Sequence, residues 1–282
     1  MEQQVLTTAL PMLILGLGWT GQFLVELLNA INLKYAATTR DGRGNTIKWT
    51  MPSTSYWATN PTGLTNLPSA QTVLITFPVI NTSEMTEFMD AYESEHGKPQ
   101  WILLSSTRPF NGTPSDRHGP MDPSRGTDRS GAEEIVLSRG GTVLHLAGLW
   151  GAARQPRQWV SRFPTEAAIR AKLLTRQLHL IHGKDVARAI LAVHEQFKSG
   201  ERWIVTDKGC YDWIRLFLAW GSPEQIAIAR SLAKNDEVCR NALGEGTLED
   251  VVARGGVVPR LNSNEFWETF GIEPTEYLTI EA

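Results

Sequence analysis

Short apolar runs alternate with helix-spaced apolar positions through the first half of the chain. Residues 12–15 form a continuous apolar run, and apolar side chains then recur on one helix face, at positions 23, 24, 27, 28 and 31. The β-branched run at 72–77 is typical of a parallel strand that is buried on both faces. Further strands or helices are expected at 35–39, 47–49, 81–96, 101–106, 127–138 and 142–146. This alternation predicts an α/β fold with a doubly wound parallel sheet.

The pattern changes in the second half of the chain. Residues 151–165 are basic and loop-like. The later elements are mostly helical and are expected at 185–198, 202–206 (a strand) and 211–220. Ser222 followed by Pro223 is a typical helix start, because serine caps free N–H groups and proline fits the first helical position. We therefore expect a core at 1–150 and a small, mostly helical lobe at 151–282 that is interleaved with the last sheet strands.

The first apolar run ends in Gly16-Leu-Gly18-Trp-Thr-Gly21, and helical spacing resumes at once. Between a strand and a helix, Gly16 permits the tight turn, Gly18 lets a pyrophosphate approach the backbone, and Gly21 lets the helix pack on the strand. Trp19 and Thr20, at the helix start, offer free N–H groups and the positive end of the helix dipole to phosphates. The sequence therefore predicts a dinucleotide-binding domain of the Rossmann type. The alternative is a glycine-rich turn without a ligand.

The end of the second strand indicates which dinucleotide is bound. NAD-selective sites place an acidic side chain there, to bind the ribose 2′-hydroxyl. Here the strand ends at Thr38 and Thr39, and Arg40 follows, with Arg43 close by. A guanidinium can grip a 2′-phosphate with two parallel hydrogen bonds, so NADP is favoured over NAD. The alternative is that Asp41 takes the ribose after a one-residue shift.

Other segments carry a family resemblance. In chain order they read ITFPV, LLSSTRPFNG, LAGLWG, HGKDVARAI, RWIVTDKGCYDWIRLF and RLNSNEFWETFGIEP. Together with GLGWTG, they resemble the extended short-chain dehydrogenase/reductase family, including its NAD-dependent epimerase/dehydratase-like members. The resemblance spans almost the whole chain, and it depends on the order and spacing of the segments more than on any single one.

The resemblance implies roles for individual residues. It places Phe77, Pro78 and Ser105 along the cofactor path and Thr107 beside the substrate oxygen. It places the substrate pocket in the lobe, at Trp150, Arg154, Arg157 and Trp159. Arginines at such positions could hold a carboxylate, a phosphate or an acidic phenol. Family members often pair through helices that flank the sheet, so a homodimer is the assembly that the resemblance suggests.

One family feature is missing from this chain. The family's acid/base chemistry depends on a Tyr-xxx-Lys pair, in which the lysine lowers the pKa of the tyrosine. The chain has no tyrosine between Tyr92 and Tyr211. Aligning either Glu133 or Glu134 with the family's glutamate does not supply the pair. The two alignments put at the pair positions Arg125 with Arg129, or Gly126 with Ser130.

A replacement for the missing acid is sought in the loop at 108–124, which follows the strand expected at 101–106. A loop held beside the nicotinamide could supply His118 or Asp116 as the acid. Thr107 or water are the other candidates. The alternative for the loop residues is an ordinary polar surface.

Composition and charge argue against several classes of binding partner. The net charge is −3, so no nucleic-acid footprint is expected. No apolar run reaches membrane-spanning length, and two cysteines make no disulfide framework, so a cytoplasmic protein is expected. A metal site is not expected either, because no third soft ligand lies near the one candidate spacing, at His179, His182 and Asp185.

Three functions remain open at this stage. The first is a small-molecule oxidoreductase that uses NADP(H) without the Tyr-xxx-Lys pair. The second is a non-redox isomerase, cyclase or dehydratase on the same scaffold. The third is a non-catalytic NADP(H) sensor. The oxidoreductase is favoured, because the cofactor path and Thr107 are kept.

Overall fold

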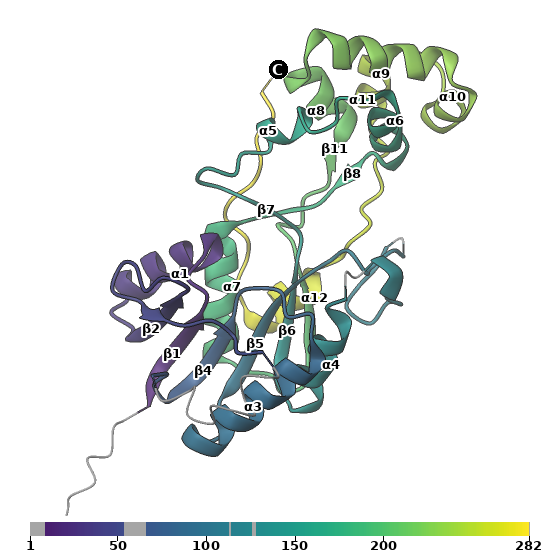
Figure 1. Cartoon of the computed structure of the whole chain (residues 1–282). Coiled ribbons are helices and arrows are strands. Elements are labelled where there is room, and N and C mark those ends of the chain that lie inside the picture. The colour runs from purple at the N-terminus through teal and green to yellow at the C-terminus, as the bar shows by residue number, and fades with distance from the viewer. Residues whose placement is uncertain (1–8, 54–65, 113, 126–127, 282) are drawn as a thin grey trace, which may run out of the picture.

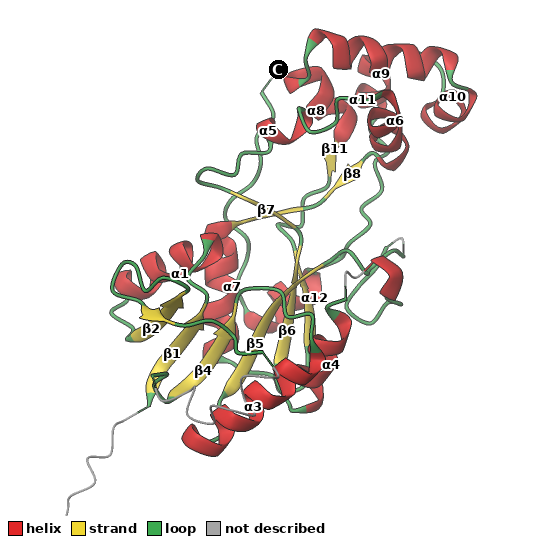
Figure 2. Ribbon diagram, viewed as in Figure 1, coloured by secondary structure: helices red, strands yellow, loops and turns green. Residues whose placement is uncertain are grey.

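The computed structural model of the protein describes residues 9–53, 66–112, 114–125 and 128–281. Its core is a seven-stranded parallel sheet with the strand order β10-β6-β5-β4-β1-β2-β3 (Figures 1 and 2). The strands are β1 (Leu10–Leu15), β2 (Tyr35–Thr39), β3 (Ile47–Lys48), β4 (Ala70–Ile75), β5 (Gln100–Ser106), β6 (Thr142–Leu146) and β10 (Arg202–Val205). The strand order reverses between β1 and β4. Ligands of doubly wound folds bind at the carboxyl ends of strands at such a reversal.

Helices cover both faces of this sheet. On one face α1 (Trp19–Ala30) packs against α7 (Gly183–Glu195), because Leu24 and Leu28 of α1 share an apolar cluster with Val186 and Ile190 of α7. The C-terminal helix α12 (Asn264–Phe270) joins the same cluster. On the other face lie α3 (Thr82–His96) and α4 (Ser130–Ser138). The predicted Rossmann-type fold is confirmed.

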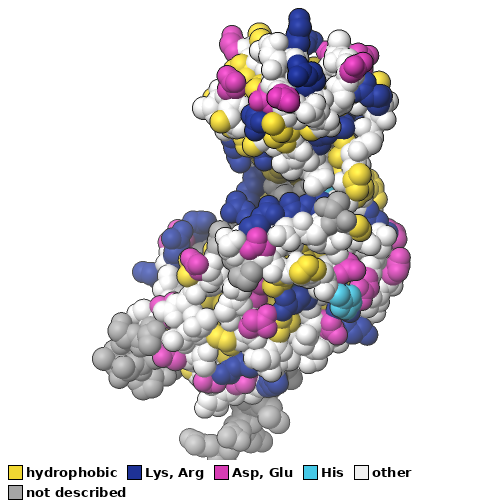
Figure 3. All heavy atoms as spheres, turned by 90° about the vertical axis from the view of Figure 1, so that its right-hand side faces the viewer, with side chains coloured by type: hydrophobic (Ala, Val, Ile, Leu, Met, Phe, Trp, Pro, Cys, Tyr) yellow, Lys and Arg dark blue, Asp and Glu magenta, His cyan; other side chains and the backbone are white. Residues whose placement is uncertain are grey.

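The second part of the chain builds its own apolar cluster outside the sheet. Two small strand pairs lead to it: β7 (Gly148–Trp150) with β9 (Leu180–His182), and β8 (Gln177–Leu178) with β11 (Tyr211–Asp212). The helices around the cluster are α5 (Arg157–Val160), α6 (Glu166–Thr175), α8 (Trp213–Trp220), α9 (Pro223–Asn235), α10 (Glu237–Leu243) and α11 (Leu248–Arg254). Figure 3 shows a narrow waist between the two parts, where Lys and Arg side chains gather on the face in view.

Three helix starts differ from the sequence expectation. The helix expected from residue 185 begins at Gly183, where the His182 side chain caps it. The helix expected from residue 127 begins at Ser130, and residues 126 and 127 lie outside the described part of the chain. The helix expected at 211–220 begins at Trp213, because Tyr211 and Asp212 pair with β8 and the Asp212 carboxylate caps the helix. Among the residues that the structure describes, no helix has the length and apolar character that a membrane span requires.

Candidate functional site

The glycine turn connects β1 to α1 in a conformation that excludes larger residues. Gly16 has a φ of +88°, and a Cβ on it would lie 2.8 Å from Cδ1 of Phe77. The Gly16 N–H donates to the Thr38 hydroxyl at 3.0 Å, and its carbonyl accepts from the Thr76 hydroxyl. A Cβ on Gly21 would lie 2.8 Å from Cδ1 of Leu17, the end of a side chain in the turn itself. Gly16 therefore has the steric reason that the sequence predicted, whereas the expected packing of Gly21 on the strand stays a prediction.

The N-terminus of α1 is open to a ligand. Gly18 is its N-cap, no side chain caps the free N–H groups, and the first turn carries no acidic residue. Gly18 has a φ of −90°, and the nearest atom to a Cβ built on it lies 3.9 Å away. Open space and unpaired N–H groups at a helix N-terminus favour a bound anion.

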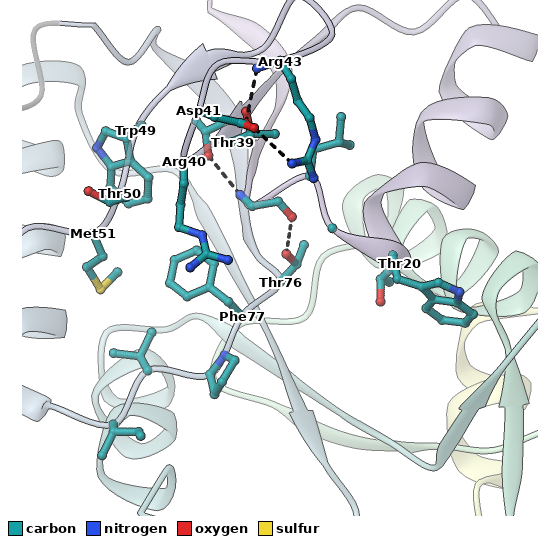
Figure 4. A pocket seen from close by; sticks show the side chains of 18 of the residues that line it. Thr20, Thr39, Arg40, Asp41, Arg43, Trp49, Thr50, Met51, Thr76 and Phe77 are labelled. Atoms are coloured by element: carbon teal, nitrogen blue, oxygen red, sulfur yellow. Dashed lines mark hydrogen bonds and ion pairs between the residues drawn. The ribbon is translucent and has the colours of Figure 1, made fainter. Parts of the chain in front are cut away.

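A cavity of about 1060 Å³ lies over this helix start. It occupies the carboxyl ends of β1, β2 and β4, beside the reversal of strand order, and is large enough for a cofactor (Figure 4). Of the residues predicted from sequence, it is lined by Gly16, Gly18, Trp19, Thr20, Arg40, Phe77, Pro78 and Arg154. Sequence reasoning missed other lining residues, including Trp49, Thr50, Met51 and Thr76. Position at a strand end is the signal that could have found them.

The end of β2 presents one free cation to this cavity. Figure 4 shows the Arg40 side chain extending into it, while Asp41 points toward Arg43. The Asp41 carboxylate accepts from the Arg43 backbone N–H and, at 3.2 Å, from its guanidinium. Arg40 is exposed and has no carboxylate within 4.0 Å in the part of the chain that the structure describes.

Ser105 lies apart from the cavity lining, in a buried polar cluster. Its hydroxyl donates to the carboxylate of Glu133, which is 2 % exposed. His145, on the neighbouring strand β6, has Nε2 3.9 Å from Glu133 and Nδ1 3.0 Å from the Ser106 carbonyl. Burial lowers the pKa of His145, so the ring is neutral near neutral pH. Ser105 thus helps to anchor α4 to β5, and its assignment to the cofactor path stays a prediction.

The helix α4 offers no tyrosine–lysine pair in its described residues. Glu133 points into the core, whereas Glu134 is paired with Arg202 at the surface. If the inward Glu133 is aligned with the family's glutamate, arginines occupy the pair positions: Arg129 directly before α4 and Arg125 in a short 3₁₀ turn. In this alignment two cations stand at the pair positions; in the other, Gly126 and Ser130 stand there, so the loss of the family's acid/base pair stays a prediction.

Thr107 and the loop after it were predicted to carry the chemistry. Thr107 is half-buried at the end of β5, where its N–H donates to the Leu146 carbonyl at 3.2 Å. It is outside the residues that line the cavity, but β5 is the strand next to β4, whose end does line it. Thr107 is therefore placed one strand along from the cavity.

Asp116 and His118 lie against the outer edge of the sheet. The Asp116 carboxylate accepts from the His118 N–H at 2.9 Å, and the His118 ring lies 3.3 Å from Glu265 of α12. Between them, Arg117 packs 4.0 Å over the ring of Trp203, on the edge strand β10. Neither Asp116 nor His118 lines the cavity. The geometry gives their proposed acid role no support, and that role stays a prediction.

The predicted substrate residues separate into two groups. Arg154 lines the cavity and lies 4.5 Å over the ring of Trp19, and Trp150 packs edge-on against His182 at 4.6 Å. Arg157 is exposed at the start of α5, and Trp159 packs against the apolar cluster of the lobe. Only Arg154 of the four reaches the cavity.

The histidines with metal-like spacing are engaged in other contacts. His179 Nε2 accepts from the Arg260 N–H at 3.0 Å, and His182 Nδ1 accepts from the Lys184 N–H at 3.2 Å. Asp185 is buried and accepts from the Thr275 hydroxyl at 2.8 Å. These contacts tie neighbouring segments together, and within the described residues no three such ligands gather into a metal site.

No family model matches the chain, and no curated protein matches it. Solved structures do. They include a UDP-N-acetylglucosamine 4-epimerase from Bacillus cereus, with 14% identity, 95% of this chain and 92% of that chain covered, and a TM-score of 0.61. A dTDP-glucose 4,6-dehydratase from Bacillus anthracis in complex with NAD has 10% identity, the same two coverages and a TM-score of 0.60.

A short-chain dehydrogenase/reductase superfamily protein from Agrobacterium tumefaciens, with bound NAD, is also similar. It has 14% identity, a TM-score of 0.59, and coverage of 94% of this chain and 93% of that one. At these identities the comparisons establish the fold. The chain thus has the fold of the short-chain dehydrogenase/reductase and epimerase/dehydratase proteins that its sequence segments resemble.

Proposed function

We propose that the protein binds NADP(H) in the cavity over α1 and acts as an oxidoreductase on a small molecule. The observation that carries this proposal is the pairing of an open α1 N-terminus with the free guanidinium of Arg40 in one cavity. The N-terminus suits a pyrophosphate, and Arg40 suits a 2′-phosphate. Two of the similar structures contain NAD, which supports a nicotinamide dinucleotide as the ligand. The preference for NADP over NAD is argued from the residues of this chain alone.

The end of β2 favours NADP over NAD in this proposal. An NAD site needs a free carboxylate at the ribose, but Asp41 is turned to Arg43. Asp41 lies at the cavity wall, but its carboxylate would have to leave Arg43 to bind the ribose. The 2′-phosphate of NADP would instead pair with Arg40, which has no carboxylate partner among the described residues.

The chemistry would take place beside the end of β5. A bound nicotinamide supplies hydride transfer, and a carbonyl carbon would accept the hydride. In this proposal Thr107, at the end of the strand next to β4, would hold the substrate oxygen through its hydroxyl. Without a tyrosine, the proton that the oxygen needs would come from water or from a loop residue.

A second candidate function is a non-redox enzyme or an NADP(H) sensor. The observation in its favour is that the chain has no tyrosine between Tyr92 and Tyr211 to serve as the general acid/base, a role that typically contributes about 10²–10⁴-fold in rate. The two candidates differ in whether NADPH is consumed. An oxidoreductase consumes NADPH with a member of a carbonyl panel, whereas a sensor binds NADPH and leaves its absorbance unchanged.

The Arg40→Ala variant tests the cofactor assignment. We expect it to weaken NADPH binding about tenfold to a hundredfold, because it removes charge-assisted hydrogen bonds to the 2′-phosphate. NADH lacks this phosphate, so its affinity should change little, and it serves as the control ligand within the same variant. Fluorescence titration of the tryptophans near the cavity measures both. Equal losses for NADPH and NADH, or none, would contradict the assignment.

A further inference from the structure

A tight turn in the lobe holds an arginine over the cofactor cavity. The N–H of Gly151 donates to the Arg154 carbonyl at 2.9 Å, and the N–H of Arg154 donates to the Gly151 carbonyl at 2.9 Å. Gly151 has a φ of +120° and Ala152 a φ of +47°, so the chain reverses within four residues. A Cβ on Gly151 would run into the His182 ring, which therefore fixes one side of the turn.

A series of rings that pack edge-to-face connects the start of α1 to the turn. Trp19 packs edge-on against Phe23 at 4.8 Å, Phe23 against His182 at 5.5 Å, and His182 against Trp150 at 4.6 Å. These rings join α1 to β7 and β9, the strand pair that leads to the lobe. Arg154 lies over the first ring of the series, with its guanidinium carbon 4.5 Å from the centre of Trp19. Its position is thus set by both parts of the molecule.

The charge at this position is not balanced within the protein. Trp19 is the first residue of α1, and the guanidinium over its ring lines the same cavity as the positive end of the helix. No carboxylate comes within 4.0 Å of Arg154 in the stretches of chain that the structure describes. The cavity lining does include Asp41 and Glu84, but Asp41 is paired with Arg43, and Glu84 lies in the first turn of α3.

A guanidinium and the positive end of a helix dipole that line one cavity together favour the binding of an anion there. The pyrophosphate of a dinucleotide carries two negative charges and belongs at a helix N-terminus of this kind. A planar guanidinium can hold one of its phosphates through two hydrogen bonds.

We infer that Arg154 contacts the cofactor pyrophosphate, and not the substrate. The lobe then contributes a phosphate ligand to the cofactor site, and the bound dinucleotide bridges the turn at 151–154 and the start of α1. This inference rests on the proposed function, because it assumes that the cavity holds a dinucleotide. It changes the role predicted for Arg154 from sequence, where the same side chain was assigned to a substrate anion.

The test compares two ligands in the full-length protein. NADPH carries both the 2′-phosphate and the pyrophosphate, whereas 2′-AMP carries the 2′-phosphate alone. Arg154→Ala should weaken NADPH binding about tenfold to a hundredfold and leave 2′-AMP binding unchanged. Arg154→Lys keeps the charge without the planar fork, so its loss for NADPH should be smaller. Arg240→Ala, at an exposed position of α10 outside the cavity lining, removes one positive charge as a matched control and should alter neither affinity.

The outcomes separate this inference from the proposed function. Unchanged NADPH affinity in Arg154→Ala, or an equal loss for both ligands, overturns the pyrophosphate contact and leaves the NADP proposal standing. A wild-type protein that binds neither NADPH nor NADH overturns both. No substrate is present in these titrations. If Arg154 binds only a substrate anion, Arg154→Ala will therefore bind NADPH as tightly as the wild type does. Ligand-free melting curves of the variants check that the turn is still folded.

Discussion

Asp207 shows at the residue scale how burial couples ionisation to stability. The residue follows β10 and is fully buried, with its carboxylate accepting from the Gly209 N–H at 2.8 Å and the Tyr211 hydroxyl at 2.6 Å. Burial raises its pKa from 3.8 to about 6, because the charged form loses its hydration; the two hydrogen bonds only partly offset this effect. Between about pH 4 and pH 6, the folded protein therefore holds a proton on Asp207 that the unfolded chain has already released.

This shift predicts a pH dependence with a definite sign. The contribution of Asp207 to stability is fully present below about pH 4 and is lost as the pH rises through about 6. The loss is about 3 kcal/mol at most. Urea unfolding across this range should therefore show the wild type losing stability relative to Asp207→Asn, which cannot ionise. Tyr211→Phe should lose more, because it removes a hydrogen bond that favours the charged carboxylate. Parallel profiles for wild type and Asp207→Asn would exclude this account.

At the element scale, helix caps and strand ends decide how much could be predicted from sequence. The start of α9 was predictable because its signals are local: Ser222 and Gln225 form a reciprocal capping box, and Pro223 opens the helix. The glycine turn was predictable for the same reason. The course of the loop at 108–124 was not, because its position depends on a distant contact of Arg117 with Trp203. Trp49 was missed as a cavity residue because the strand before it has only two residues, which is too short for a sequence pattern to mark where the strand ends.

The cap of α9 provides a prediction at this scale. Ser222→Ala removes a hydroxyl that accepts from the Gln225 N–H at 3.2 Å, and it should lower the free energy of unfolding by about 1 kcal/mol. Ser222→Asp keeps an accepting oxygen and adds a negative charge at the positive end of the helix, so it should retain most of the stability. Chemical denaturation measures both variants. A loss as large for Asp as for Ala would show that the hydroxyl does not act as a cap.

At the scale of the whole molecule, the cavity lies where the core and the lobe meet. Its lining comes from the ends of β1, β2 and β4, together with Leu149 of β7 and Arg154 of the lobe. In Figure 1 the loop between β7 and α5 lies on the side of α1. A dinucleotide in this cavity would therefore contact both parts. Arg154 is the lobe side chain through which we expect the lobe to bind it.

The most direct test of the account is calorimetry with NADPH on the wild type and on Gly18→Asp. At position 18 the φ of −90° and the open space around a Cβ allow a side chain, so the variant should fold and melt as the wild type does. Its carboxylate, however, would occupy the place of the pyrophosphate and repel it. We predict saturable binding heat for the wild type and none for the variant. Equal binding by both proteins, or no heat from the wild type, would contradict the claim that the start of α1 holds a dinucleotide.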